Sequence, residues 1–122
     1  MKKVLSLVLM LCLVLSVAAS AETIVVMPKL VGIPYFNASE VGALEAGKEL
    51  GIEVIYTGPT EGDAAQQVQM IEDLLIRGID CLAIAPNEPD AVSPVLLKCA
   101  EEGVLVVDWD TTAKGDDVKY SI

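Results

Sequence analysis

Residues 51–59, with the sequence GIEVIYTGP, decide the fold, because related stretches recur at residues 78–86 (GIDCLAIAP) and 103–110 (GVLVVDWD). Each stretch begins with a glycine and continues with a short apolar run rich in β-branched residues. A glycine in this place is typical of the end of a helix, and the run after it is typical of a strand. The repeat therefore predicts three units in which a helix leads into a strand.

The segment before Gly51 has the apolar spacing of a helix. Asn37 and Glu40 predict an N-cap residue and its capping-box partner. Val41 and Leu44 then start the apolar stripe that should face the sheet. We therefore expect a helix that begins at Asn37 and ends at Gly51.

The next two helices have their own start signals. Asp63 and Gln66 predict a second N-cap pair ahead of the helix that ends at Gly78. The third helix is expected to start within residues 89–93, because Pro94 should be tolerated only in a first turn.

Strands are expected at residues 23–27, 52–56, 81–84 and 104–108. Their apolar runs show little polar alternation, which indicates strands buried on both faces of a parallel sheet. Strands that alternate with helices predict an α/β doubly wound parallel sheet with right-handed crossovers. We expect this sheet to form one domain over residues 22–122.

The first 21 residues predict a secretory signal peptide. Two lysines precede an apolar run at residues 4–17, and Ala19-Ser20-Ala21 matches a cleavage site. The run is too short for a permanent membrane span, and Cys12 lacks the small residues that a lipoprotein signal places before its cysteine. We expect cleavage before Glu22, a soluble periplasmic product and no membrane insertion afterwards.

The charge excludes some partners. The whole chain has a formal net charge of −10, and removal of the two leader lysines would make it more acidic. Nucleic acids and anionic lipid surfaces require a basic face on the protein. We therefore expect neither as a partner.

The composition also argues against catalysis. The chain has no histidine, which removes histidine acid–base chemistry, the Ser-His-Asp triad and most zinc sites. No serine lies in a G-x-S-x-G elbow. We expect no enzyme activity, no catalytic residue, no metal and no cofactor. Cys81 and Cys99 are expected to be buried free thiols, with a disulfide permitted by export as the alternative.

In a doubly wound sheet, ligands bind beyond the carboxyl ends of the strands, where the strand order reverses. The segments that follow the predicted strands bring six candidate residues to this edge: Lys29, Tyr35, Phe36, Asn87, Trp109 and Asp110. Ammonium donors, carboxylate acceptors and aromatic faces together suit a small, neutral, hydroxyl-rich molecule. Phosphate fits less well, because the chain has no P-loop and Asp110 would repel an anion.

Each candidate also has a structural alternative. Lys29 could be a solvated surface residue, and Asp110 could cap a turn through Thr112. The aromatic candidates could pack in the core or under the sheet edge: Tyr35, Phe36 and Trp109.

Several stretches together carry a family resemblance: MPKLVGIPYF, AGKELGIEVIYTGPTE, QVQMIEDLLIRGID, APNEPDAVSPVL and GVLVVDWDTTAK. The chain resembles the N-terminal lobe of type I periplasmic sugar-binding proteins, especially the autoinducer-2 and rhamnose receptors of ABC importers. The resemblance implies that Lys29 and Asp110 line the sugar pocket. Tyr35 and Phe36 take the place of the first-loop aromatics, although Pro34 before them departs from the family pattern.

The resemblance implies noncovalent binding of autoinducer-2 or a deoxyhexose such as rhamnose, completed by hinge closure, for delivery to a membrane permease. Family members have two similar lobes, so a chain that stops at Ile122 is expected to be a truncated receptor that holds the first lobe alone. A sensory input to a chemoreceptor or kinase is an alternative. A contrasting class is a secreted flavodoxin-like enzyme, or a receiver-like domain using Asp108 and Asp110. A receiver would be cytoplasmic, so the signal peptide disfavours that reading.

Overall fold

The computed structural model describes residues 22–115, 118 and 120–121. The predicted signal peptide and Cys12 lie outside the described residues. Strands and helices alternate along the chain in this order: β1 (Thr23–Met27), α2 (Pro34–Leu50), β2 (Glu53–Tyr56), α3 (Ala64–Arg77), β3 (Cys81–Ile84), α4 (Pro89–Glu101), β4 (Leu105–Asp108) and β5 (Tyr120–Ser121). The four predicted strands are therefore confirmed to within one residue at each end.

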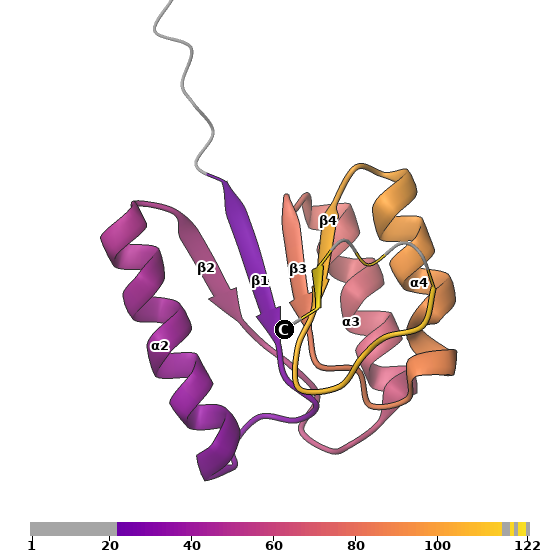
Figure 1. Ribbon diagram of the computed structural model, residues 1–122, viewed down its shortest axis with the longest axis horizontal. Helices are drawn as coiled ribbons and strands as arrows, with labels where there is room; N and C mark the ends of the chain where they lie inside the picture. The colour runs from indigo at the N-terminus through magenta and orange to yellow at the C-terminus, as the bar shows by residue number, and fades with distance from the viewer. Residues whose placement is uncertain (1–21, 116–117, 119, 122) are drawn as a thin grey trace, which may run out of the picture.

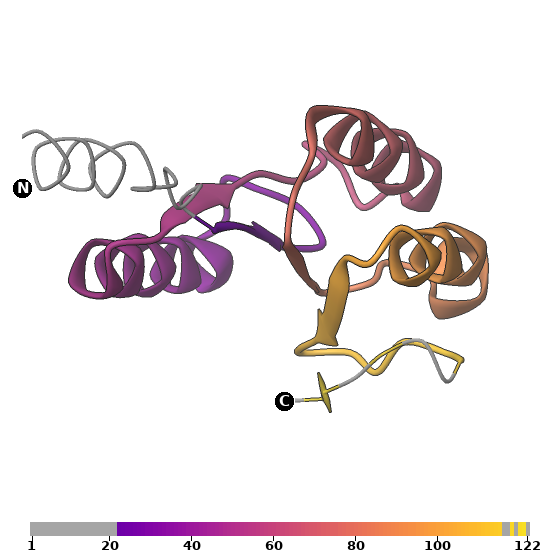
Figure 2. The same ribbon diagram turned by 90° about the horizontal axis from the view of Figure 1, so that it is seen from above.

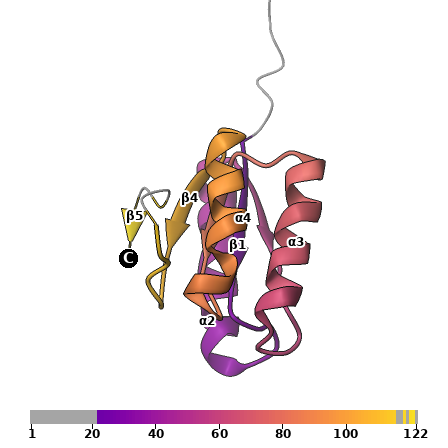
Figure 3. The ribbon, with the colours of Figure 1, turned by 90° about the vertical axis from the view of Figure 1, so that its right-hand side faces the viewer.

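The strands form one parallel sheet in the order β2-β1-β3-β4-β5. The order reverses beside β1, which has β2 on one side and β3 on the other (Figure 1). Helix α2 lies on one face of the sheet, and α3 and α4 lie on the other (Figure 2). The predicted doubly wound α/β fold is confirmed. The short strand β5, which the sequence analysis did not predict, extends the sheet beyond β4 (Figure 3).

The core lies between the sheet and the pair α3 and α4. Alternate residues of the central strands point into it and are fully buried: Val25, Met27, Leu82, Ile84 and Val106. Helices α3 and α4 complete it with buried side chains that include Ile71, Val92 and Leu96. Every second residue of each central strand faces α3 and α4, and the apolar faces of these helices pack against those residues. Together they form a single apolar layer.

The opposite face of the sheet is partly open, so the prediction that both faces are buried is wrong for the described residues. The side chains on that face are half-buried or exposed: Ile24, Val26, Cys81, Ala83, Leu105 and Val107. Leu105 is 39% exposed. Helix α2 packs mainly against β2, at one end of the sheet, and no described helix covers β3 and β4 on this side (Figure 2).

Helix α2 begins earlier than the sequence analysis predicts. Its first residue is Pro34, after the extended residue Ile33, so Asn37 lies inside the helix and caps nothing. A proline at the first helical position has a suitable backbone angle and needs no N–H partner there. The predicted stripe is also wrong, because Val41 is 57% exposed and Leu44 is 37% exposed.

The starts of α3 and α4 fall where they were predicted. Asp63 caps α3, and its Oδ1 accepts hydrogen bonds from the backbone N–H groups of Ala65 at 2.8 Å and Gln66 at 3.4 Å. Helix α4 starts at Pro89, inside the predicted range. Pro94 nevertheless lies beyond the first turn of α4, so the argument used to place that start was wrong.

The three glycines of the repeat confirm their predicted place at the ends of helices. Gly51, Gly78 and Gly103 have positive φ angles of 68°, 85° and 83°. This conformation is easy for glycine and unfavourable for residues with a Cβ. Each glycine therefore lets the chain leave a helix and turn toward the next strand.

Cys81 and Cys99 are free thiols on opposite sides of the sheet. Cys99 is buried in α4, whereas Cys81 is only half-buried and belongs to the partly open face. Burial raises the pKa of the Cys99 thiol to about 11, so this thiol is neutral at physiological pH. Among the described residues, no helix is long and apolar enough to cross a membrane.

Candidate functional site

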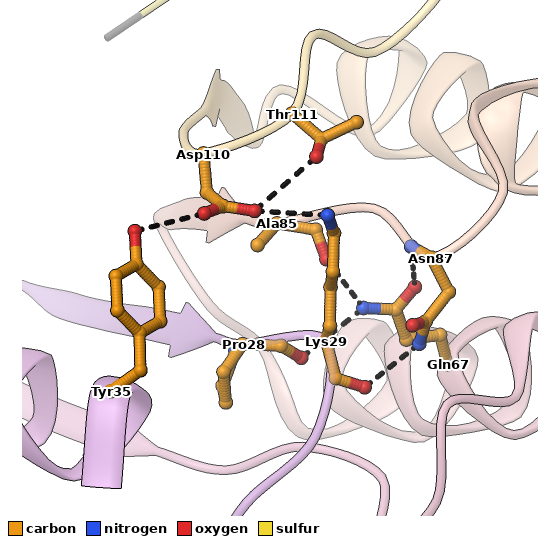
Figure 4. A network of polar contacts seen from close by, with 8 residues as sticks. All are labelled: Pro28, Lys29, Tyr35, Gln67, Ala85, Asn87, Asp110 and Thr111. Atoms are coloured by element: carbon orange, nitrogen blue, oxygen red, sulfur yellow. Dashed lines mark hydrogen bonds and ion pairs between the residues drawn. The ribbon is translucent and has the colours of Figure 1, made fainter. Parts of the chain in front are cut away.

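The loops that follow β1, β3 and β4 meet at the carboxyl edge of the sheet, beside the strand-order reversal (Figure 1). A group of four polar side chains, which we call the edge cluster, lies there: Lys29, Tyr35, Asp110 and Thr111. Lys29 Nζ is 2.9 Å from Asp110 Oδ2. The Tyr35 hydroxyl donates to Asp110 Oδ1 at 2.9 Å, and the Thr111 hydroxyl donates to Oδ2 at 3.3 Å (Figure 4).

The edge cluster is accessible to solvent and holds fixed charges at neutral pH. The side chains of Lys29 and Asp110 are 30% and 19% exposed. The hydrogen bond from Lys29 lowers the pKa of Asp110, partial burial opposes this effect, and the hydrogen bond from Tyr35 adds to it. The bond to Asp110 raises the pKa of Tyr35. Asp110 is therefore a carboxylate and Tyr35 a neutral phenol over the physiological range.

The backbone of Asp110 has an unusual conformation. Its φ angle is 63°, the one positive φ at a non-glycine residue within the described chain. A residue with such a backbone angle is held there by its surroundings, because the left-handed region is unfavourable for most side chains. The described bonds of the carboxylate do not include Thr112, so the capping alternative is not what the structure shows.

Gln67 organises this edge, and the sequence analysis assigned it no role. Its side chain is fully buried, and Nε2 donates to the carbonyls of Pro28 at 3.2 Å and Ala85 at 2.9 Å. Its Oε1 accepts the backbone N–H of Asn87 at 2.9 Å. Gln67 therefore joins the loops after β1 and β3 (Figure 4). Its position one turn before Ile71, on the apolar face of α3, was the available signal.

Asn87 continues this network to the loop that carries Lys29. Its Nδ2 donates to the Lys29 carbonyl at 2.8 Å, and its side chain is half-buried. The contact holds the backbone from which the Lys29 side chain extends toward Asp110 (Figure 4). Direct contact of Asn87 with a ligand stays a prediction.

The three aromatic candidates form a connected row with different exposures. Phe36 is 3% exposed, and its ring lies edge-on to Tyr35 at 5.0 Å and to Trp109 at 5.7 Å between centroids. The Trp109 indole donates to the Ala83 carbonyl at 3.3 Å. Tyr35 is 64% exposed. Because α2 starts at Pro34, Tyr35 and Phe36 lie in its first turn, with Phe36 packed inward and Tyr35 directed to the edge cluster.

The edge cluster offers donors, an acceptor and a phenol ring, without a described set of residues that could hold a metal ion. No group of three or more histidine, cysteine, aspartate or glutamate residues gathers in the described part of the chain. A separate groove of about 280 Å³ lies between β2 and α3, lined by Ile55, Thr57, Met70, Asp73, Leu74 and Arg77. Its apolar floor suits hydroxyl groups less well than the edge cluster does.

The fold and the edge cluster define the class of the protein as a doubly wound α/β unit with polar side chains gathered at the strand-order reversal. The sequence profile described as "Periplasmic binding protein domain" matches residues 24–122. The chain belongs to this family. The resemblance found in the sequence is thereby confirmed.

Two curated relatives are named for the sugars they bind. The chain is 32% identical over 101 residues to the D-ribose/D-allose-binding protein of Pseudomonas aeruginosa, a match that covers 76% of the chain and 32% of the relative. It is 29% identical over 135 residues to the ribose import binding protein RbsB of Bacillus subtilis, covering 98% of the chain and 44% of that protein. The chain thus spans less than half the length of these relatives.

Two solved structures share the fold. LsrB from Clostridium saccharobutylicum in complex with AI-2 has a TM-score of 0.79 and 27% identity, over 81% of the chain and 30% of that protein. A solute-binding protein of Clostridium phytofermentas with bound L-rhamnose has a TM-score of 0.79 and 26% identity, over 85% of the chain and 32% of that protein.

Proposed function

We propose that this chain forms one wall of the binding site for a small, neutral, sugar-like molecule. The observation that carries the proposal is the edge cluster, in which an ammonium and a carboxylate lie 2.9 Å apart at the carboxyl edge. A hydroxyl-rich ligand can accept a hydrogen bond from Lys29 and donate one to Asp110. The strand-order reversal at this edge is where α/β sheets of this type bind ligands.

The chemistry of the edge cluster favours a neutral polyol over a charged ligand. Lys29 and Asp110 balance each other's charge, so the pair offers a strong donor and a strong acceptor without a net charge. Tyr35, with 64% of its surface exposed, adds a hydroxyl and a ring edge. Phe36 and Trp109 support this arrangement from below through their ring contacts.

We extend the proposal to the biological setting. The chain serves as part of a periplasmic solute-binding protein of an ABC importer, exported by its leader, with a membrane permease as partner. Autoinducer-2 and rhamnose are the finer candidates for the ligand. The similarity to LsrB in complex with AI-2 and to the L-rhamnose complex supports both, and the ribose and allose relatives place pentoses and hexoses among the ligands to be tested.

The test is a titration of the ¹⁵N-labelled chain followed by NMR. D-Ribose, D-allose, L-rhamnose and AI-2 are added separately, with inorganic phosphate as an anionic comparison. We expect saturable shifts of the Lys29, Tyr35 and Asp110 signals with at least one of the four and weaker effects with phosphate. Saturable shifts confined to the groove at Ile55 and Met70, or stronger binding of phosphate, would contradict the proposal.

A further inference from the structure

Asp108, the last residue of β4, is a buried acidic residue that the edge cluster does not use. Only 1% of it is exposed. Its Oδ2 accepts the backbone N–H of Ala113 at 2.6 Å. Its Oδ1 is buried and has no hydrogen-bond partner among the described residues. A buried carboxyl oxygen without a hydrogen-bond partner costs free energy, so its presence needs an explanation.

The bond from Asp108 closes the loop that presents Asp110. At the start of this loop, the N–H of Trp109 donates to the Ile84 carbonyl at 3.0 Å. At its end, the N–H of Ala113 is fixed by Asp108. Asp110 lies between these two fixed points in its left-handed conformation.

The 2.6 Å contact between Asp108 Oδ2 and the N–H of Ala113 ties the end of the loop to β4. The loop holds Asp110 at a φ angle of 63°, in the less populated left-handed region, and its two fixed ends help to keep it there. A weaker bond at Ala113 would release the turn and allow the Asp110 carboxylate to leave Lys29.

We propose that Asp108 is a positioning residue that holds Asp110 against Lys29 and Tyr35 through its bond to Ala113. It touches no ligand itself. This inference deepens the proposed function, since it rests on Asp110 being a contact of the ligand. It makes a separate claim about the structure, however, which can be tested without any ligand.

The first test measures the Asp110 carboxyl group by ¹³C NMR during a pH titration of the full chain. Asp108→Leu removes the acceptor for Ala113, so Asp110 should lose Lys29 and its pKa should rise toward the ordinary value of 3.8. Asp108→Asn keeps an oxygen acceptor and should retain most of the wild-type behaviour. An unchanged Asp110 pKa in folded Asp108→Leu protein would overturn the proposal.

Asp63→Leu is the matched control. Asp63 also accepts backbone N–H groups, at the start of α3, but it has no contact with the loop after β4. Its loss should lower stability and leave the Asp110 pKa unchanged. A purely structural role for Asp108 would make the two leucine variants behave alike.

Ala113→Pro covers the case in which Asp108→Leu does not fold. Proline removes the N–H donor at the other end of the same bond and leaves the buried carboxylate in place. The Asp110 pKa should again rise, and a wild-type value in this variant would count against the proposal.

Sugar titrations separate this inference from the proposed function. D-Ribose and L-rhamnose are added to the wild type, Asp108→Asn and Asp108→Leu, and we expect at least tenfold weaker binding for Asp108→Leu alone. If no sugar binds the wild type but Asp108→Leu still raises the Asp110 pKa, the positioning role stands and the proposed function fails. If Asp108→Leu keeps both the wild-type Asp110 pKa and wild-type sugar binding, the positioning role fails and the proposed function stands.

Discussion

Lys29 Nζ and Asp110 Oδ2 lie 2.9 Å apart, which joins the loop after the first strand to the loop after the fourth. Both side chains are partly exposed, and ion pairs of this kind contribute little to folding stability. The same exposure leaves both groups open to a ligand. These properties fit the binding role that we propose for the pair better than a role in stability.

Replacement of Lys29 by methionine tests this explanation. The change keeps the length of the side chain and removes a charged hydrogen bond, worth about 1.5–3 kcal/mol, so the affinity for a sugar should fall by roughly tenfold to a hundredfold. Asp110→Asn should have a comparable or larger effect. The NMR titration gives the affinity, and the melting temperature of the ligand-free chain should change little in either variant.

Lys98→Met is the matched control for this prediction. Lys98 lies on α4, 4.0 Å from Glu72, far from the edge cluster. The Lys98→Met variant loses the same positive charge as Lys29→Met and should bind sugar like the wild type. If Lys29→Met also binds like the wild type, Lys29 is a surface residue without a binding role.

The charge state of Asp110 should depend on Lys29. The hydrogen bond from Lys29 lowers the Asp110 pKa below its ordinary value of 3.8. The stabilisation from the pair is therefore present at neutral pH and is lost as the pH falls through the lowered pKa. In Lys29→Met, a ¹³C-detected titration should show an Asp110 pKa closer to 3.8, with a smaller rise in Tyr35→Phe. Equal titration curves would show that the pair does not form in solution.

The two interior glycines of α2 should respond in opposite ways to alanine. At Gly42 an added Cβ meets no atom within 4 Å, so Gly42→Ala should stabilise the chain by about 0.5–1 kcal/mol. At Gly47 it would lie 2.6 Å from Val54 Cγ2, so Gly47→Ala should destabilise by about 1–3 kcal/mol. Urea unfolding measures both. Stabilisation at Gly47 would mean that α2 packs on β2 less closely than the structure shows.

Loss of Gln67 should weaken the whole sheet edge. Gln67→Leu removes the hydrogen-bond partner of two carbonyls and of the Asn87 N–H at the sheet edge. This loss should destabilise the chain by about 3 kcal/mol. Gln69→Leu is the control, because Gln69 is exposed and bonds only to Asp73 one turn away. It should change stability by less than about 0.5 kcal/mol. Similar urea midpoints for the two variants would exclude the organising role of Gln67.

Two candidate cap residues distinguish the sequence prediction from the structure. Asp63→Ala removes a cap that the structure shows and should destabilise by about 1 kcal/mol. Asn37→Ala affects a residue inside α2 and should be neutral or slightly stabilising, because alanine favours a helix interior. Thermal melts of both variants decide the point. Destabilisation by Asn37→Ala would instead support the predicted start of the helix at Asn37.

Much of this architecture could be predicted from the sequence because it depends on local patterns. Glycines after helices and β-branched runs located the strands, and parallel strands bring the loops that follow them to one edge. Lys29 and Asp110 could therefore be predicted to converge. The sequence could not show that they contact each other directly, since this depends on the left-handed turn at Asp110.

Other features depend on tertiary contacts that no short pattern records. Pro34 starts α2 three residues before the expected cap, which places Tyr35 within reach of Asp110. In the sequence Gln67 is an ordinary polar residue of a helix. Its role depends on the carbonyls of the two loops to which it donates, and no local pattern predicts these contacts. The half-open sheet face was mispredicted because apolar strands were taken to imply a cover on both sides.

The central position of β1 in the sheet affects the order in which the strands can pair during folding. β1 comes first in the sequence, but its neighbours β2 and β3 come later. A chain that emerges with its N-terminus first, from a ribosome or through an export channel, cannot pair both edges of β1 until residues 81–84 have followed. Until then one edge of β1 stays unpaired and open to other chains. Delayed emergence of β3 should therefore promote aggregation more than an equal delay after β4.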